Sequence, residues 1–372
     1  MTAKATIRPV PPSPKATGPV TMKALVYKGV GKKAYEDRPK PGILTSTDAI
    51  VRVTKTTICG TDLHILKGDV PTAKIGQILG HEGVGVVDAI GSGVTSFKPG
   101  DRVLISCVTS CGRCPACRKL MFSHCENGGW ILGNGIDGTQ ADFVRIPYAD
   151  TGLYPILDGE DESSFLMCSD ILPTGLECGV LNGHVEPGSS VAIVGSGPIG
   201  LAALLTAQLY SPAAIIMIDI DDKRLAIAKA FGATHVVNST DGKAAEAVRK
   251  IIGGTGVDTA IEAVGVPATF ELCEQIIGPG GHIANIGVHG KPVSLHLEQL
   301  WDRNISITTR LVDTSSTPML LRVLRSKKID PTRLITHTFT FVKIIDAYDT
   351  FANAAKTGAL KVLIDAQEVV AK

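Results

Sequence analysis

Four cysteines lie within a fifteen-residue stretch of the chain, at Cys111, Cys114, Cys117 and Cys125. Two gaps of two residues and one gap of seven allow a short loop to fold back, so that four thiolates meet at one point. Such a set suits a tetrahedral zinc ion with Zn–S distances of about 2.3 Å. Because four protein ligands leave no open position, we expect this site to hold the loop in shape and to perform no chemistry.

Two other interpretations of these cysteines remain, a pair of disulfides and an iron–sulfur cluster. We expect no signal peptide, and 9 cysteines in 372 residues are few for a disulfide framework. The bacterial ferredoxin motif ends in Cys-Pro, whereas Glu126 follows Cys125 here. Structural zinc is therefore favoured, and a catalytic metal would need ligands elsewhere.

A second group of candidate metal ligands comes from the segments Cys59-Gly-Thr61-Asp62-Leu-His64 and Gly80-His81-Glu82. A thiolate and an imidazole are good zinc ligands, and catalytic zinc sites combine three protein ligands with one open position. Taken alone, Cys59 could equally be a small buried apolar residue and His81 a hydrogen-bonded core histidine. The pair becomes informative only together with the rest of the chain.

A glycine-rich turn, Gly195-Ser-Gly197-Pro198-Ile199-Gly200, follows the apolar run 191–194 and precedes the apolar run 201–209. A strand before and a helix after is the context that makes GxGxxG specific for a dinucleotide. Gly195 permits the tight turn, Gly197 lets a pyrophosphate approach the backbone, and Gly200 lets helix and strand pack closely. The helix N-terminus then offers free N–H groups and a positive dipole end to the phosphates.

The next apolar run, 215–218, ends in Asp219, roughly 20 residues beyond the first glycine. A carboxylate there accepts hydrogen bonds from the adenosine ribose and repels a 2′-phosphate, so it favours NAD over NADP. Arg224 could attract a phosphate, but Asp221 and Asp222 keep the local field acidic. We therefore predict NAD as the preferred coenzyme.

The segments that must position these residues show two different patterns of secondary structure. Residues 22–150 hold short β-branched runs broken by glycine, which predict a β-rich domain. From about residue 172 strand-like and helix-like segments alternate, which predicts an α/β doubly wound parallel sheet. The last part of the chain is expected to return to the first domain. Residues 1–21, with five prolines and no apolar segment, are expected to be a disordered extension.

Composition excludes several classes of partner. The chain has 37 basic and 36 acidic residues, so its charge gives no reason to expect nucleic acid or a membrane surface as partner. No apolar run approaches the roughly 20 residues of a membrane span. We expect a cytoplasmic α/β enzyme that acts on a small molecule.

Taken together, the motifs resemble those of the zinc-containing medium-chain alcohol dehydrogenases. The segment Gly80-His81-Glu82-x₂-Gly85-x₅-Gly91 matches the signature of that family. The four-cysteine loop, the turn at 97–103 and GxGxxG follow in the order of the family. The resemblance implies a GroES-like catalytic domain (22–171 and 309–372) with an inserted NAD-binding Rossmann domain (172–308).

The resemblance also implies a catalytic zinc site. Cys59 and His81 match two of its ligands, and Asp170 stands where the third ligand lies, four residues before Thr174. Many relatives have cysteine at this position, and Cys168 lies two residues upstream. Glu82 matches an acid behind the zinc. Asp62 matches the residue that orients His81.

Further roles are implied for residues around the substrate. Thr61 and His64 match a proton relay, and Thr174 matches a residue that seats the nicotinamide. Asp170 and Trp130 resemble the bacterial secondary-alcohol branch, in which the position of Trp130 walls the substrate cavity. The implied activity is reversible hydride transfer between an alcohol and NAD, in a homodimer or homotetramer with two zinc ions per chain.

Three alternatives stay open. A polyol, diol or amino-alcohol (threonine-type) dehydrogenase would share every motif. A zinc-free quinone-reductase-like relative would lack Cys59, His81 and the four-cysteine loop. A zinc- and nucleotide-binding protein without turnover would have no need of Thr61 and His64 as a relay.

Overall fold

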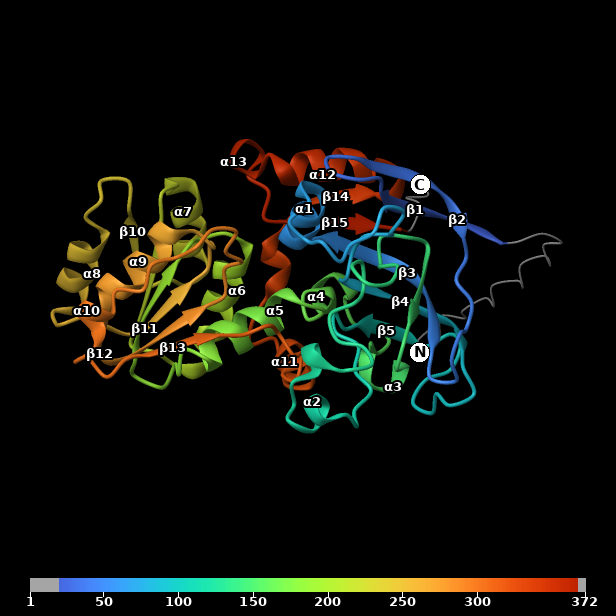
Figure 1. Cartoon of the computed structure of the whole chain (residues 1–372), viewed down its shortest axis with the longest axis horizontal. Helices are drawn as coiled ribbons and strands as arrows, with labels where there is room; N and C mark the ends of the chain where they lie inside the picture. The colour runs from blue at the N-terminus through green and yellow to red at the C-terminus, as the bar shows by residue number, and fades with distance from the viewer. Residues whose placement is uncertain (1–19, 367–372) are drawn as a thin grey trace, which may run out of the picture.

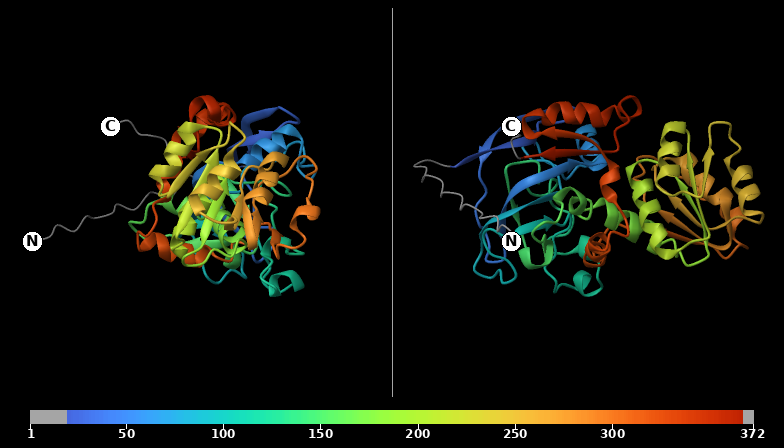
Figure 2. Two further views of the ribbon diagram at one scale, coloured as in Figure 1. Left: turned by 90° about the vertical axis from the view of Figure 1, so that its left-hand side faces the viewer. Right: turned by 180° about the vertical axis from the view of Figure 1, so that it is seen from behind.

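The computed structural model describes residues 20–366, which form two lobes that each contain a β-sheet. Figure 1 shows the lobe of β10–β13 at one end of the molecule and the lobe of β1–β5 at the other, and Figure 2 shows the same division from behind. No helix among residues 20–366 is long and apolar enough to cross a membrane.

Most of the predicted N-terminal extension, residues 1–19, lies outside the described residues. Its last two residues do not fit that prediction. Strand β1 (Thr21–Tyr27) begins inside the extension, and Thr21 pairs with Pro39 of β2 (Lys33–Pro39). The reason is the antiparallel pairing, which covers all seven residues of each strand.

The first lobe is built mainly on a mixed sheet that contains strands from both ends of the chain. Its order is β14-β15-β3-β4-β5-β7, with β6 paired to β3. β15 runs antiparallel to β3, so the chain re-enters this lobe after building the other one. The strands are β3 (Ala49–Ile58), β4 (Gly83–Ile90), β5 (Arg102–Ile105), β6 (Phe143–Ile146), β7 (Leu153–Pro155), β14 (Ile335–Thr340) and β15 (Lys361–Asp365).

The second lobe is a six-stranded parallel sheet in the order β10-β9-β8-β11-β12-β13. The strand order reverses between β8 and β11, and open α/β sheets bind their ligands at such a point. The predicted doubly wound sheet is confirmed. Its strands are β8 (Ser190–Val194), β9 (Ala214–Asp219), β10 (His235–Asn238), β11 (Val257–Glu262), β12 (Ile277–Asn285) and β13 (Ser306–Thr309).

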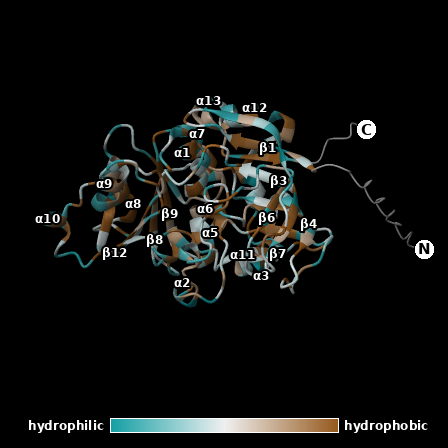
Figure 3. Ribbon diagram, turned by 45° about the vertical axis from the view of Figure 1, so that its right-hand side comes forward, coloured by the Kyte–Doolittle hydropathy of each residue, from teal (hydrophilic) through white to brown (hydrophobic). Residues whose placement is uncertain are grey.

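Alternate residues of the parallel strands pack into two separate cores. Val191 and Ile193 belong to the core on one face of the sheet, whereas Ala192 and Val194 belong to the core on the other. Side chains of a strand point alternately to its two faces, so a continuous apolar run is what a strand buried on both faces requires. Figure 3 shows the apolar colour concentrated along these strands.

Helices cover both faces of this sheet and connect the lobes. Around the sheet lie α6 (Pro198–Ala207), η3 (Gln208–Tyr210), α7 (Asp222–Ala230), α8 (Ala244–Ile252), α9 (Pro267–Ile276) and α10 (Leu297–Leu300). In or near the first lobe lie α1 (Gly60–Lys67), α2 (Pro115–Arg118), η1 (Phe122–His124), α3 (Ala149–Gly152), α4 (Glu162–Leu166), α5 (Ile171–Thr174), the π-helix η2 (Gly175–Leu181), α11 (Thr317–Arg325), η4 (Pro331–Leu334), η5 (Phe341–Lys343), α12 (Ile344–Ala352) and α13 (Ala354–Thr357).

Between β14 and β15 the tail forms three short helical elements, η5, α12 and α13, with a break at Asn353. We propose domain boundaries at 22–171 with 309–372 for the GroES-like domain and at 172–308 for the Rossmann domain.

A return segment, residues 310–316, leads from β13 back to the first lobe and is held by a buried carboxylate. Glu177 of η2 is fully buried. It accepts hydrogen bonds from the backbone N–H groups of Asp313 (2.9 Å) and Ser316 (2.8 Å) and from the Ser316 hydroxyl (2.7 Å). Thr314 adds a hydroxyl contact of 3.0 Å to Ser106, next to β5. The connection between the lobes is therefore fixed at its centre.

We expect Glu177→Ala to lower the free energy of unfolding by about 3 kcal/mol, because several buried donors lose their acceptor. Denaturant titration would measure this change. Glu186→Ala is the matched control, since Glu186 is exposed and its loss should leave stability nearly unchanged. Equal effects of the two substitutions would show that the return segment does not depend on Glu177.

Candidate functional site

The four predicted cysteines converge in the loop that contains α2 and η1. The sulfur atoms of Cys111, Cys114, Cys117 and Cys125 all lie within 4.8 Å of one another, and those of Cys114 and Cys125 are 4.0 Å apart. Four Zn–S bonds of about 2.3 Å in a tetrahedron place the sulfurs about 3.8 Å apart, so the set fits zinc. All nine cysteines are free thiols, which excludes the disulfide interpretation. This is the structural zinc site.

Backbone groups prepare part of this site for a metal. The N–H groups of Arg113 and Cys114 act on the thiol of Cys111 and lower its pKa to about 6, against the effect of burial. A thiolate is the form that ligates zinc, so the loop favours the required protonation state before any metal binds.

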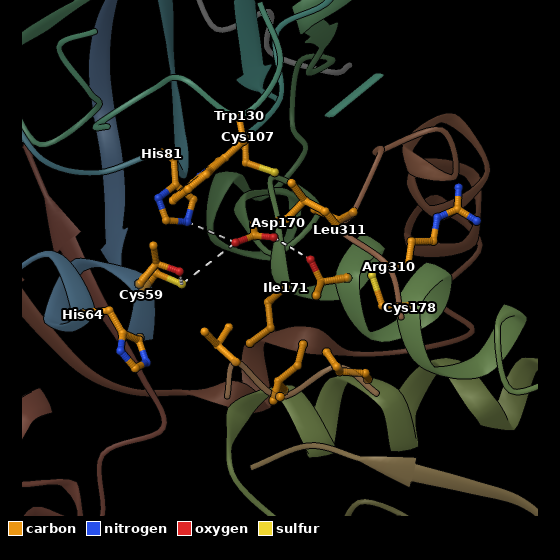
Figure 4. A pocket seen from close by; sticks show the side chains of 18 of the residues that line it. Cys59, His64, His81, Cys107, Trp130, Asp170, Ile171, Cys178, Arg310 and Leu311 are labelled. Atoms are coloured by element: carbon orange, nitrogen blue, oxygen red, sulfur yellow. Dashed lines mark hydrogen bonds and ion pairs between the residues drawn. The ribbon is translucent and has the colours of Figure 1, made fainter. Parts of the chain in front are cut away.

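A second cluster joins Cys59, His81, Glu82 and Asp170, whose ligand atoms also lie within 4.8 Å of one another. His81 Nε2 is 3.1 Å from Asp170 Oδ2, and Cys59 Sγ is 3.9 Å from the same oxygen. Figure 4 shows the three side chains pointing toward one another. One thiolate, one imidazole and carboxylate oxygens are the donor set of a catalytic zinc, so the residues fit that ion.

Two residues of this cluster are helix N-caps, and a third lies in a turn before β4. Cys59 is the N-cap of α1, and Asp170 is the N-cap of α5. His81 follows Gly80, which has φ +92°, and a Cβ on Gly80 would lie 2.6 Å from Gln140 Cγ. Because only glycine fits this turn, the Gly80-His81 pair in the sequence has a steric cause.

Asp170, and not Cys168, lies in this cluster. Cys168 is fully buried among apolar side chains, and burial raises the pKa of its thiol. Burial alone would also raise the pKa of Asp170, but the hydrogen bond and charge of His81, helped by the Thr174 hydroxyl, hold it at about 2. Asp170 is therefore a carboxylate throughout the physiological pH range.

Glu82 lies behind this cluster and forms a buried ion pair. Its Oε2 is 2.5 Å from Lys361 Nζ of β15, and both side chains are 2% exposed. Among the described residues, Glu82 Oε1 has no hydrogen-bond partner. The sequence analysis missed Lys361, although one lysine inside the apolar run of the last strand was a signal that could have found it.

Asp62 differs from its expected role. In the described part of the chain it does not hydrogen-bond His81. Its Oδ2 accepts from the Cys59 N–H (2.9 Å) and from Gln140 Nε2 (3.1 Å), and Gln140 in turn accepts from the Tyr348 hydroxyl (2.7 Å). Asp62 is the third residue of α1, where an acidic side chain turns back to the N-cap N–H. It therefore positions the backbone of Cys59.

A cavity of about 1160 Å³ opens beside the second cluster and is lined by residues of both lobes. Thr61 and His64 of α1 line it, and His64 Nδ1 is 2.9 Å from Asp69 Oδ2. Trp130 also lines it and meets the His81 ring edge-to-face, with centroids 6.5 Å apart. Further lining residues are Thr174, Pro198 and Ile199, and also Cys107, Cys178 and Arg310, which sequence reasoning missed.

The glycine turn lies between β8 and α6, at the side of this cavity. A Cβ on Gly200 would lie 1.9 Å from the Gly195 carbonyl oxygen, whereas a Cβ on Gly197 would approach no atom closer than Arg224 Nη1 at 3.9 Å. Gly197 is thus the open position of the turn. The buried hydroxyl of Ser196 has no partner among the described residues, which leaves a donor available to a ligand.

Asp219 ends β9 next to this turn. Its carboxylate accepts hydrogen bonds from the backbone N–H groups of Ser196 (2.7 Å), Ile220 (2.8 Å) and Asp221 (3.0 Å). Arg224 lies on α7 and lines a smaller groove together with Asp221 and Lys223. Apart from Thr174 on α5, the predicted cofactor residues therefore lie at or just beyond the carboxyl ends of β8 and β9.

Comparisons with known proteins agree with this geometry. A model described as "Alcohol dehydrogenase GroES-like domain" matches residues 45–157, and one described as "Zinc-binding dehydrogenase" matches residues 198–325. The chain is 39% identical over 363 residues to an alcohol dehydrogenase of Cupriavidus necator, which covers 92% of this chain and 98% of that protein.

Solved structures show the same similarity. A zinc-dependent alcohol dehydrogenase from Streptococcus pneumoniae is 54% identical, with a TM-score of 0.90 over 94% of this chain and 100% of that one. An alcohol dehydrogenase of Escherichia coli complexed with NADH is 26% identical (TM-score 0.85, 93% and 99% covered). A zinc-binding dehydrogenase of Sinorhizobium meliloti bound to NADP is 28% identical (TM-score 0.84, 93% and 99% covered).

We expect Asp170→Ala to lower the zinc content from about two ions per chain to about one and to abolish nearly all turnover, because the second cluster loses a ligand. Cys168→Ala is the control and should keep both ions, since Cys168 lies in the apolar core. Elemental analysis of the purified variants measures the outcome. The opposite pattern would move the third ligand to Cys168.

Proposed function

Because the chain belongs to the zinc-containing medium-chain alcohol dehydrogenase family, we propose that it oxidises a secondary alcohol to a ketone, reversibly, with NAD as hydride acceptor. The observation that carries this proposal is the shared cavity. The cluster of Cys59, His81 and Asp170 and the first turn of α6 (Pro198, Ile199) line the same space, so a substrate carbon and a nicotinamide can meet there.

The residues around the second cluster have separate tasks. We propose that Cys59, His81 and Asp170 hold the catalytic zinc and that Glu82 lies behind it. When bound, zinc supplies a Lewis acid that lowers the pKa of the alcohol hydroxyl. Lys361 neutralises Glu82, so the cluster does not carry a third uncompensated negative charge.

Proton removal is assigned to α1. Thr61 and His64 are three residues apart on this helix, which places them on one face, and both line the cavity. A hydroxyl can accept a proton and donate its own, and a histidine titrates near neutral pH. We propose that Thr61 takes the proton of the substrate hydroxyl and that His64, next to Asp69, releases it at the cavity rim.

The coenzyme proposal rests on the glycine turn and Asp219. The N-cap of α6 is Gly197, which has no side chain to cap the first N–H groups of the helix, so these remain available to a pyrophosphate. Asp219 would meet the adenosine ribose, with Arg224 beside it, and Thr174 would seat the nicotinamide. Since similar structures hold either NADH or NADP, the preference for NAD rests on the charge of Asp219.

The secondary-alcohol preference rests on Trp130. Its indole lies edge-on to His81 and so occupies apolar volume beside the metal cluster. A polyol or diol is the second candidate substrate, because Arg310 adds hydrogen-bond donors to the same cavity.

We propose a homo-oligomer, dimer or tetramer, on the evidence of one sheet edge. Among residues 20–366, β13 ends the parallel sheet and pairs with β12 alone. Leu297 and Trp301, beside it in sequence, are large apolar residues with 59% and 78% exposure. An unpaired strand edge with apolar neighbours favours association with another chain.

We also propose a cytoplasmic location. The nine cysteines are free thiols, and the four of the structural site must stay reduced to bind zinc. A reducing compartment meets that requirement.

Steady-state assays of the wild type with primary alcohols, secondary alcohols and diols test the function directly. We expect kcat/KM to be highest with secondary alcohols and about 10- to 100-fold higher with NAD than with NADP, because Asp219 repels a 2′-phosphate. Asp219→Gly should lower the ratio of kcat/KM with NAD to kcat/KM with NADP. Asp219→Asn should lower the same ratio while keeping an acceptor for the Ser196 N–H. A wild-type preference for NADP would refute the coenzyme assignment.

We expect Trp130→Ala to admit bulkier ketones while changing Tm by less than about 4 °C, because the side chain lines a cavity. Phe165→Ala is the contrast, since Phe165 is a core residue and its removal should cost about 3–5 kcal/mol. Thermal unfolding, together with reduction rates for small and bulky ketones, distinguishes a cavity-lining role of Trp130 from a role in the core. A large fall in Tm with an unchanged substrate profile would refute the cavity role.

A further inference from the structure

Arg310 is a fixed cation in the wall of the cavity. It directly follows β13, and its Nε and Nη2 donate to Asp313 Oδ2 at 3.2 and 2.8 Å. The other oxygen of Asp313 accepts hydrogen bonds from the N–H (3.0 Å) and hydroxyl (2.6 Å) of Ser123. Ser123 belongs to residues 111–125, the small projection of the first lobe that carries the four cysteines and is called the four-cysteine lobe below. The guanidinium is therefore held by a carboxylate whose other oxygen is anchored by Ser123.

The anchoring leaves part of the guanidinium free. Among the residues from 20 to 366, no partner accepts a hydrogen bond from Nη1 of Arg310, and the side chain is 32% exposed and lines the cavity. A guanidinium has five N–H donors in a rigid fork, of which only two are engaged here. The unused donors form a ready site for an oxygen-rich group of a ligand.

The coenzyme phosphates are not the natural partner of this site. The glycine turn follows β8, whereas Arg310 follows β13, three strand positions away in the same sheet. Neighbouring strands lie about 4.8 Å apart, so the two sites are separated by about 14 Å across the sheet. The ligand of Arg310 is expected at the substrate end of the cavity.

Charge in the cavity supports an anionic group. The acidic lining residues are paired within the protein: Asp69 with His64, Glu82 with Lys361, Asp170 with His81 and Asp313 with Arg310. Lys119, also in the lining, has no ion-pair partner within residues 20–366. It lies in the four-cysteine lobe, whose residue Ser123 contacts Asp313. Lys119 therefore adds a positive charge to this side of the cavity, where Asp313 balances the charge of Arg310.

An apolar surface adjoins both the metal cluster and Arg310. One apolar cluster also lines the cavity, and its members there are Cys107, Cys178, Val312 and Ile286. Figure 4 shows Cys178 and Arg310 on the side of Asp170 away from Cys59 and His64. A substrate with its alcohol carbon at the metal cluster and an aliphatic spacer would bring a distal group toward Arg310.

We propose that Arg310, anchored by Asp313 and Ser123, binds a carboxylate at the far end of the substrate, so that the enzyme acts on aliphatic hydroxy acids and the matching keto acids. This inference rests on the proposed function and narrows its substrate class. Arg310 is then a specificity-determining residue that contacts substrate, and the four-cysteine lobe contributes to specificity by orienting it.

The test compares ketones that differ only at the far end, reduced with NADH by the zinc-loaded enzyme. The pairs are 2-pentanone with 4-oxopentanoate and 2-hexanone with 5-oxohexanoate, and 5-hydroxy-2-pentanone is the neutral polar analogue. We expect kcat/KM of the wild type to be at least about tenfold higher for one of the keto acids than for its matched ketone, as charge-assisted hydrogen bonds allow. Pentanoate should also inhibit competitively at lower concentration than pentanamide.

Three variants locate the effect. Arg310→Met should lower kcat/KM for the preferred keto acid about 10- to 100-fold and change the ketone less than about threefold. Arg310→Lys keeps a positive charge beside Asp313, which protects folding. It should lower kcat/KM for the preferred keto acid about three- to tenfold, because lysine lacks the planar, bidentate guanidinium. Arg322→Met, on the exposed face of α11, is the control and should leave every ratio unchanged.

Several outcomes would overturn the inference. If 2-pentanone is reduced normally but neither keto acid is preferred, the carboxylate site is wrong while the proposed function stands. If Arg310→Met weakens NADH binding for all substrates alike, Arg310 serves the coenzyme. If Arg310→Met lowers kcat/KM for 5-hydroxy-2-pentanone as much as for the keto acid, the site binds a neutral hydroxyl. Failure to reduce any carbonyl compound would instead refute the proposed function.

Discussion

The ion pair of Glu82 and Lys361 joins distant parts of the chain behind the metal cluster. Both side chains are only 2% exposed, so the carboxylate and the ammonium group have lost nearly all their hydration. Each group therefore depends on the other to remain ionised. Lys361 comes from the last strand, β15, whose pairing with β3 brings it to the site. The charge behind the cluster is therefore balanced by a residue that follows the whole second lobe in the sequence.

The same dependence explains how the cavity keeps its shape. The return segment crosses from one lobe to the other and forms one wall of the cavity. Glu177 holds its centre, and Ser123 holds Asp313 from the four-cysteine lobe. The structural metal site is thus connected through hydrogen bonds to a residue of the cavity, although none of its four cysteines lines that cavity. A site that performs no chemistry can in this way influence which substrate is bound.

Three features were predictable from the sequence alone, because their main physical causes are local. The four-cysteine site needs only a loop of fifteen residues, and its spacing already restricts the ligand geometry. The glycine turn is recognised from the strand before it and the helix after it, and the restriction on Gly200 arises within that unit, where a Cβ would lie 1.9 Å from the Gly195 carbonyl oxygen. Gly195 is restricted in addition by Ala263 and Val264, which follow β11. The parallel sheet was equally predictable, since a strand buried on both faces must be apolar throughout.

Tertiary structure decided what depends on residues far apart in the chain. Asp170 and Cys168 are both plausible ligands in the sequence, but a turn near α5 directs one to the metal cluster and the other into the apolar core. Asp62 bonds the backbone of Cys59 because of its position in the first turn of α1, and Lys361 meets Glu82 because of strand pairing. Arg310 was not recognised at all, since its meaning comes from Asp313, Ser123 and a cavity between two lobes. Residue types and short spacings therefore predicted the chemistry, whereas long-range packing decided which side chains carry it, because hydrogen bonds and burial are set by neighbours that the local sequence does not contain.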